Sequence, residues 1–172
     1  MTTAVRLFAV VLLIAVQSAL AAHLAILGVA PDLPLIAVML AAFGQGPVRG
    51  GLFGLGVGLA LDVLRGDRIG LFALAAGVAG WLCGEAAARV DPARASVRWL
   101  VAAGAAGIYG MVIVVCSLLL DRGEVDVVGA LRHVAIAALY DGTLAALAYW
   151  PVARRAQGPV LPARAHPESR GR

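Results

Sequence analysis

The sequence predicts an all-α integral membrane protein, a single bundle of six membrane-spanning helices. Of its 172 residues, 62% are hydrophobic, and the mean hydropathy is +0.92. A soluble domain has an apolar share of about 45–50%, so this composition excludes a soluble globular protein. At about 20 residues a span, the chain has room for six spans with short connections and for no further domain. The predicted spans are residues 5–27, 33–45, 47–64, 69–89, 99–120 and 131–150.

The first two spans differ in length. Residues 5–27 form a continuous apolar run, longer than the roughly 7–15 apolar residues of a secretory signal peptide, so we expect this span to be retained. The second span opens with Pro31-Asp32-Leu33-Pro34, where Asp32 can cap free backbone N–H groups and the prolines remove no needed donor. At about 18 Å it is short of a hydrocarbon core of about 30 Å. This helix therefore either thins the bilayer or is partly buried in protein.

A ridge of small residues runs along the third helix, which opens at Pro47. Gly50, Gly54, Gly58 and Asp62 recur at every fourth position, so they share one side of a helix. Glycine lets helices approach closely in lipid, so the ridge predicts a surface for helix packing or for binding a partner. The fourth helix carries a second ridge of the same spacing, which is able to face the first. Its members are Ala76, Gly80, Gly84 and Ala88.

Two acidic residues lie near the ends of these helices. Asp62 is close to Arg65 and Arg68, so it either forms a local ion pair or faces a partner. Near the outer surface an acid is inexpensive to place, which favours Asp62 as a polar anchor at the helix end. Glu85 precedes Arg89 by four residues, a spacing that predicts an ion pair at the membrane surface.

Asp141 lies close to the middle of the sixth span. A charge at the bilayer centre costs about 2.5–3.5 kcal/mol on insertion scales, so an acid there is expected to have a role. The sequence leaves open a hydrogen bond to a neighbouring helix, a proton or ion site, and some other role. The hydrogen bond is favoured because the other intramembrane polar residues, Gln17, Tyr109 and Thr143, are poor proton relays.

The arginine distribution predicts the orientation in the membrane. With six spans and the N-terminus inside, the positive-inside rule is satisfied, because cytoplasmic segments hold ten arginines and outer segments hold four. Merging the second and third spans would put the loop at 89–98 and the C-terminal tail on the opposite side from the N-terminus. We therefore expect both termini in the cytoplasm, with Pro151 ending the last helix. Residues 151–172 are predicted to form a disordered basic tail.

The residues that carry enzyme chemistry are missing from the sequence patterns. There is no Gly-x-Ser-x-Gly, no phosphate-binding loop with its lysine, and no His/Cys cluster at metal-ligand spacing. The two cysteines, Cys83 and Cys116, lie inside apolar segments and are expected to serve packing. The sequence therefore predicts no enzyme, with no catalytic residue, no cofactor-binding residue and no metal site.

The order of motifs resembles the family of the rod shape-determining protein MreD. Pro31-Asp32-Leu33 opens the second helix, and Gly58-Leu59-Ala60-Leu61-Asp62 ends the third. Members share a small six-span bundle, the Pro-Asp-Leu opening, and a Gly-Leu-x-x-Asp-Leu followed shortly by Leu-Gly. This chain departs conservatively, with Val63 for the usual Leu, Ile69 before the Gly, and Trp81 for a frequent Tyr. The motif residues carried over are Pro31, Asp32, Gly58, Asp62, Gly66 and Gly70.

The resemblance implies a non-enzymatic scaffold of the bacterial cell-elongation (rod) complex, which maintains cell shape and lateral peptidoglycan synthesis. Members lie in the cell inner membrane beside MreC, and they link cytoplasmic MreB filaments to RodA and its penicillin-binding transpeptidase. For this chain the implied partners are an MreC-like membrane protein, RodA with its transpeptidase, and the lipid bilayer, and not nucleic acid. The basic tail is expected to contact either MreB or anionic lipid.

Two other functions stay open at the level of sequence. The family's bundle resembles the substrate-binding S subunits of energy-coupling-factor vitamin transporters, and the pairs Ala15/Ala19 and Ala21/Ala25 would suit a coupling interface. Such a subunit needs an aromatic-lined pocket, and aromatic residues make up only 6% of this chain. The second alternative is a small proton-coupled transporter that uses Asp141.

Overall fold

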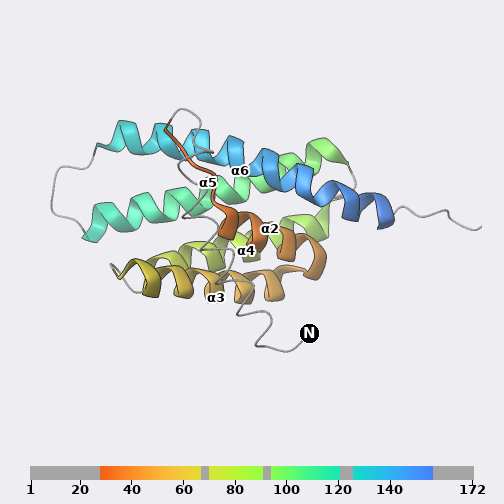
Figure 1. The fold of residues 1–172 in the computed structure, drawn as a ribbon, viewed down its shortest axis with the longest axis horizontal. Coiled ribbons are helices and arrows are strands. Elements are labelled where there is room, and N and C mark those ends of the chain that lie inside the picture. Colours follow the sequence, from red (N-terminus) through yellow and green to blue (C-terminus); the bar gives the residue numbers. More distant parts are fainter. Residues whose placement is uncertain (1–27, 67–69, 91–93, 121–125, 157–172) are drawn as a thin grey trace, which may run out of the picture.

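The computed structural model describes residues 28–66, 70–90, 94–120 and 126–156. Within these ranges the chain is all α-helical apart from short connections (Figure 1). The predicted span at 5–27 and most of the predicted tail lie outside the described residues. The five helices are α2 (Leu33–Gln45), α3 (Pro47–Arg65), α4 (Leu71–Arg89), α5 (Ala95–Leu120) and α6 (Val127–Ala156).

The described helices make a multi-pass membrane protein by length and hydropathy. Four of them, α3 to α6, are long and apolar enough to cross a membrane. The prediction of six spans is not met, because α2 has only 13 residues. At 1.5 Å a residue, α2 covers about 20 Å and cannot cross a core of about 30 Å by itself. The described part of the chain therefore holds four candidate spans and one short apolar helix.

The helices are arranged as two antiparallel pairs with α2 between them. Figure 1 shows α3 beside α4 and α5 beside α6, and α4 also contacts α5. The short helix α2 packs against α3, α4 and α6, and its Val38, Met39 and Ala42 are completely buried. Of the two alternatives for this short helix, thinning of the bilayer or burial in protein, the contacts of α2 agree with burial in protein.

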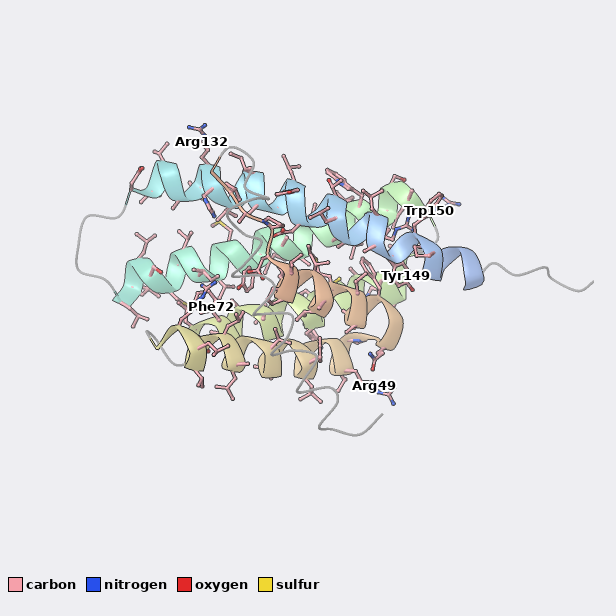
Figure 2. All side chains as sticks on the ribbon, viewed as in Figure 1. Arg49, Phe72, Arg132, Tyr149 and Trp150 are labelled. Atoms are coloured by element: carbon pink, nitrogen blue, oxygen red, sulfur yellow. The ribbon has the colours of Figure 1, made fainter. Side chains whose placement is uncertain are left out.

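Charged and aromatic side chains lie toward the two ends of the bundle. Figure 2 shows Arg49 near the start of α3 and Arg132 on α6, both pointing away from the helices. Trp150 is about half exposed, while the neighbouring Tyr149 is buried and its ring centroid lies 5.1 Å from that of Phe43. Such residues are typical of the two interfaces between membrane and water.

The sixth helix is longer than predicted at both ends. It begins at Val127 because Asp126 caps it, with Oδ1 accepting the N–H of Gly129 at 2.9 Å. Pro151 does not end the helix, which continues to Ala156, so the predicted tail begins later than residue 151. A proline inside a helix disturbs the carbonyl bonds of the preceding turn. One residue before the carbonyl affected by Pro151, the buried Arg98 donates from Nε to the carbonyl oxygen of Ala146 at 2.9 Å.

Candidate functional site

The glycine ridge of α3 packs against α4 within the same chain. A Cβ atom added at Gly50 would lie 2.8 Å from the carbonyl oxygen of Gly80. At Gly54 and Gly58 it would clash more severely, with the carbonyl groups of Ala76 and Phe72. These contacts are with backbone, which cannot give way as a flexible side chain can. The ridge therefore serves helix packing, and α4 leaves no groove there for the helix of another protein.

The second ridge faces the first, as the spacing predicted. Gly80 approaches the backbone of Gly50, and a Cβ at Gly84 would lie 2.6 Å from the backbone N and Cα atoms of Pro47. Gly56, which lies between two ridge positions, has open space around its missing Cβ. The restriction to glycine thus follows one side of α3.

Asp62, at the end of the ridge, is buried and caps the start of α4. Gly70 precedes α4 with φ of 101°, a conformation that favours glycine, and it has no side chain to cap the helix. Asp62 supplies the missing acceptors from eight or more residues away. Its Oδ2 accepts the N–H groups of Gly70 at 2.9 Å and Ala73 at 3.1 Å, and its Oδ1 accepts that of Phe72 at 2.9 Å.

The predicted partner-facing role of Asp62 is therefore wrong, whereas its prediction as a polar anchor at the helix end agrees with these bonds. The side chain is 1% exposed, and its oxygens are bonded to the first turn of α4. Arg65 instead places its guanidinium over the ring of Phe72, 4.2 Å from the centroid. Arg68 lies outside the described residues. By contrast, the ion pair between Glu85 and Arg89 is confirmed, at 2.6 Å.

Gly66 ends α3 with φ of 65°, a left-handed conformation that is costly for residues with a Cβ. Its N–H donates to the carbonyl oxygen of Asp62 at 3.0 Å. Gly66, Gly70 and the Asp62 carboxylate together turn the chain from α3 into α4. This explains in structural terms why the motif joins two glycines to one acid.

The second motif acid, Asp32, connects three parts of the bundle. Its Oδ1 caps α2 by accepting the N–H of Leu35 at 3.0 Å, as predicted for this residue. Its Oδ2 accepts the hydroxyl of Tyr109 on α5 at 3.2 Å. Its own N–H donates to Oδ1 of Asp141 on α6 at 2.9 Å. The start of α2 is thereby tied to both helices of the second pair.

This cluster lies at membrane depth. Asp141 precedes Trp150 by nine residues and Tyr109 follows Trp99 by ten, so each is about 14–15 Å along its helix from an aromatic residue of the expected interface. A helix that starts inside the bilayer must find acceptors for its free N–H groups in protein, since no water is available. Asp141 provides such an acceptor, which confirms the predicted interhelical hydrogen bond. Its role as a proton site stays a prediction.

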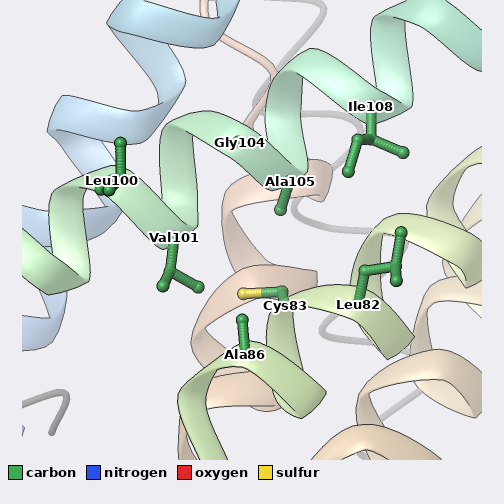
Figure 3. A pocket seen from close by; sticks show the side chains of 8 residues that line it. All are labelled: Leu82, Cys83, Ala86, Leu100, Val101, Gly104, Ala105 and Ile108. Atoms are coloured by element: carbon green, nitrogen blue, oxygen red, sulfur yellow. The ribbon is translucent and has the colours of Figure 1, made fainter. Parts of the chain in front are cut away.

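An apolar groove lies between α4 and α5, on the surface of the bundle. Its volume is about 320 Å³, and Figure 3 shows Cys83 and Ala86 from α4 facing Val101 and Ala105 from α5 across it. Gly104 lies in its wall with open space beside the backbone. Cys83 is buried and serves packing, as predicted, and Cys116 is partly exposed. The remaining lining residues are Leu82, Leu100 and Ile108.

Within the described ranges, no group of three or more His, Cys, Asp or Glu side chains could hold a metal ion. Sequence reasoning missed the part played by Tyr109, which is 77 residues from Asp32 in the chain. A polar residue within an apolar span was the signal, but it did not identify the partner. Comparisons of this chain with protein-family models, with curated proteins and with solved structures give no match.

Proposed function

We propose that this protein is a non-enzymatic membrane scaffold of the bacterial cell-elongation complex, held in the inner membrane with both termini in the cytoplasm. In this role it binds an MreC-like membrane protein and, with it, RodA and its penicillin-binding transpeptidase. The proposal rests on the resemblance of the motifs at Pro31–Leu33 and Gly58–Gly70 to those of the MreD family, together with what these motifs do in the fold.

The observation that carries the proposal is the architectural use of both motif acids. Both carboxyl oxygens of Asp62 accept hydrogen bonds from the first turn of α4. Those of Asp32 accept hydrogen bonds from Leu35 and Tyr109. A catalytic acid needs an oxygen that can reach a substrate, and these carboxyls are bonded to the protein's own groups. Motif residues that build the bundle favour a protein that works through its shape and its partners.

The ridge of Gly50, Gly54 and Gly58 is excluded as the partner surface because α4 occupies it. A partner would instead meet outward faces of the helices. On α3 such a face is apolar and exposed, with Leu52 at 64% and Val63 at 67% exposure. In lipid no hydrophobic driving force acts between helices, so their association depends on how well their surfaces pack together. An exposed apolar face of this kind can therefore bind the helix of a partner if the two surfaces fit.

Depletion of the protein in its native bacterium tests the proposal. We expect the cells to round up and to regain their shape when the wild-type gene is restored. We also expect an MreC-like protein to co-purify with the tagged protein from gently solubilised membranes. Unchanged shape together with no co-purified elongation protein would contradict the proposal.

The same strain separates the two alternatives. A vitamin requirement on depletion, or tight vitamin binding by the purified protein, would favour an S subunit of a vitamin transporter. Restoration of cell shape by Asp62→Ala would not distinguish the functions, because this change acts on the fold. Restoration by Asp141→Asn would count against a proton-coupled transporter, since this variant removes the only acid near the middle of a described span.

A further inference from the structure

The apolar groove between α4 and α5 is open on its outer side and closed toward the core. Cys83 on α4 and Ala105 on α5 line its inner side (Figure 3) and are 1% and 3% exposed. Along its outer edge, Leu100 is 66% exposed, and a Cβ added at Gly104 would meet no atom within 4 Å. Its volume of about 320 Å³ lies at the lower end of the range of small-molecule sites, about 300–1,000 Å³. The groove therefore has room for a ligand.

The width and the chemistry of the groove favour a hydrocarbon chain as its occupant. A helix with its side chains is about 10–12 Å across, so the helix of a partner would rest on the rim and leave the groove unfilled. The lining is apolar, and its least apolar side chain is the weakly polar thiol of Cys83. An acyl chain of a membrane lipid is much narrower than a helix, and it has no polar group that would need a partner in the groove.

The groove runs from the expected membrane surface into the bilayer. Trp99 directly precedes Leu100, the first lining residue of α5, and tryptophan is typical of the level of the lipid headgroups. From Leu100 to Ile108 the helix rises by about 12 Å. An acyl chain in the groove would therefore lie along the two helices, in the direction of the chains of the surrounding lipid, with its headgroup at the level of Trp99.

Each wall of the groove leads to an arginine at this end of the helices. Residues seven apart lie on the same side of a helix. Arg94 precedes the lining residue Val101 on α5 by seven positions. Arg89, the last residue of α4, follows the lining residue Leu82 by the same number. The carbonyl oxygen of Arg94 accepts the N–H of Arg98 at 3.0 Å, so the hydrogen bonding of α5 begins at Arg94.

Of these two exposed arginines, Arg94 is the better candidate to bind a ligand. Arg89 pairs with Glu85 at 2.6 Å, so its charge is offset within α4. A guanidinium forms two parallel hydrogen bonds to a phosphate, which gives it both charge and geometry for this group. A phospholipid combines a phosphate with acyl chains in one molecule, and it therefore matches both Arg94 and the groove.

We propose that the groove between α4 and α5 binds one acyl chain of a phospholipid, whose phosphate is bound at the membrane surface by Arg94. The lipid then lies at the junction between the α3–α4 pair and the α5–α6 pair. This site does not depend on which proteins the bundle binds, so it can be measured on the purified chain.

Native mass spectrometry of the purified full-length protein in mild detergent tests the site. The probe is phosphatidylglycerol, and a diacylglycerol with the same acyl chains is the comparison. We expect the wild type to bind phosphatidylglycerol more tightly, because the diacylglycerol has no phosphate. Arg94→Gln should weaken the binding of phosphatidylglycerol by about fivefold, the contribution of one arginine near the surface. Arg132→Gln is the matched control, because it removes an exposed arginine from α6, outside the groove, and should leave the affinity unchanged.

Filling the groove gives the second test. Gly104→Phe places a ring in the groove, and its Cβ displaces no atom. We expect this variant to lose the bound phosphatidylglycerol. Gly56→Phe is the matched control, since its Cβ also enters open space, but on α3, and we expect it to bind the lipid as the wild type does.

Several results would overturn the proposal. Equal binding of the two lipids by the wild type is one, and this result needs no variant to fold. Undiminished binding of phosphatidylglycerol by Gly104→Phe, or equal losses in Arg94→Gln and Arg132→Gln, would be others. A lower folded yield of Gly104→Phe than of Gly56→Phe, or a change in the number of chains in its particle, would show that the groove holds protein instead of lipid.

Discussion

The backbone N–H of Asp32 donates to Oδ1 of Asp141 across 2.9 Å, although 109 residues separate the two in the chain. The bond joins the first turn of a helix that starts within the membrane to the middle of a helix that crosses it. In a bilayer the donors of such a turn have no water to bind. The fold of this protein thus depends on acids placed where a helix begins, and Asp62 does the same for α4.

Replacing Asp62 by Ala should destabilise the protein strongly. Three backbone N–H groups would lose their acceptor, and hydrogen bonds to a charged group are worth about 1.5–3 kcal/mol each. We expect the free energy of unfolding in micelles to fall by at least about 3 kcal/mol. Asp126→Ala is the control, since it removes one exposed cap bond and should cost about 1 kcal/mol. Equal effects of the two changes would contradict the role assigned to Asp62.

The two faces of α3 should respond differently to a larger side chain. Gly54→Leu drives atoms into the backbone of Ala76, whereas Gly56→Leu extends into open space on the same helix. We expect Gly54→Leu to abolish or severely reduce folded protein, and Gly56→Leu to have a folded yield and melting temperature close to those of the wild type. Size-exclusion chromatography and thermal unfolding measure both. A well-folded Gly54→Leu protein would show that the α3–α4 contact is not as close as described.

Tyr109→Phe keeps the ring and removes the hydroxyl that binds Asp32. Removal of this donor leaves a partly buried carboxyl oxygen of Asp32 without it, which predicts a decrease in stability of about 1–3 kcal/mol. Tyr149→Phe is a matched control, because its hydroxyl lies 3.5 Å from the carbonyl oxygen of Phe43, at the limit of a hydrogen bond. A smaller effect of Tyr109→Phe than of Tyr149→Phe in thermal unfolding would count against the cluster.

Backbone conformation gives a further contrast between two glycines with open surroundings. Gly66→Ala places a Cβ on a residue with φ of 65°, which costs about 1–2 kcal/mol. Gly44→Ala falls in the last turn of α2 and should be neutral or stabilise by up to about 1 kcal/mol. The free energies of unfolding of the two variants, measured under the same conditions, test this contrast. A Gly66→Ala protein more stable than the wild type would contradict the cost assigned to the left-handed conformation.

Local patterns in the sequence predicted much of the bundle. The proline at 47 and the cap at Asp32 fixed where α2 ends and begins, and the four-residue spacing of small residues predicted that α3 and α4 face each other. These features depend on neighbouring residues and on helix periodicity alone. The span predicted at 33–45 coincides with α2, but its limited length makes it a buried short helix and not a crossing one.

The remaining features depend on contacts between distant parts of the chain. Arg65 lies close to Asp62 in sequence, yet the Asp62 carboxylate binds backbone N–H groups at the start of α4, and the Arg65 guanidinium lies over Phe72. The sequence marks Tyr109 as a polar residue within an apolar span but does not identify Asp32 as its partner, since any of several helices could have supplied the donor. Likewise, Pro151 suggested a helix end, whereas α6 continues through it while Arg98 binds a carbonyl of the preceding turn.

The cap that Asp62 provides for α4 also bears on how the protein is made. The donors at the start of α4 are satisfied by α3, and the glycine ridges of the two helices fit each other. The backbone N–H groups of Gly70, Phe72 and Ala73 in this hairpin therefore need no partner from later parts of the chain. A ribosome that has completed residue 89 has synthesised a pair of helices able to enter the bilayer together. The start of α2, by contrast, is attached to α6 only after Asp141 has been synthesised, 109 residues after Asp32.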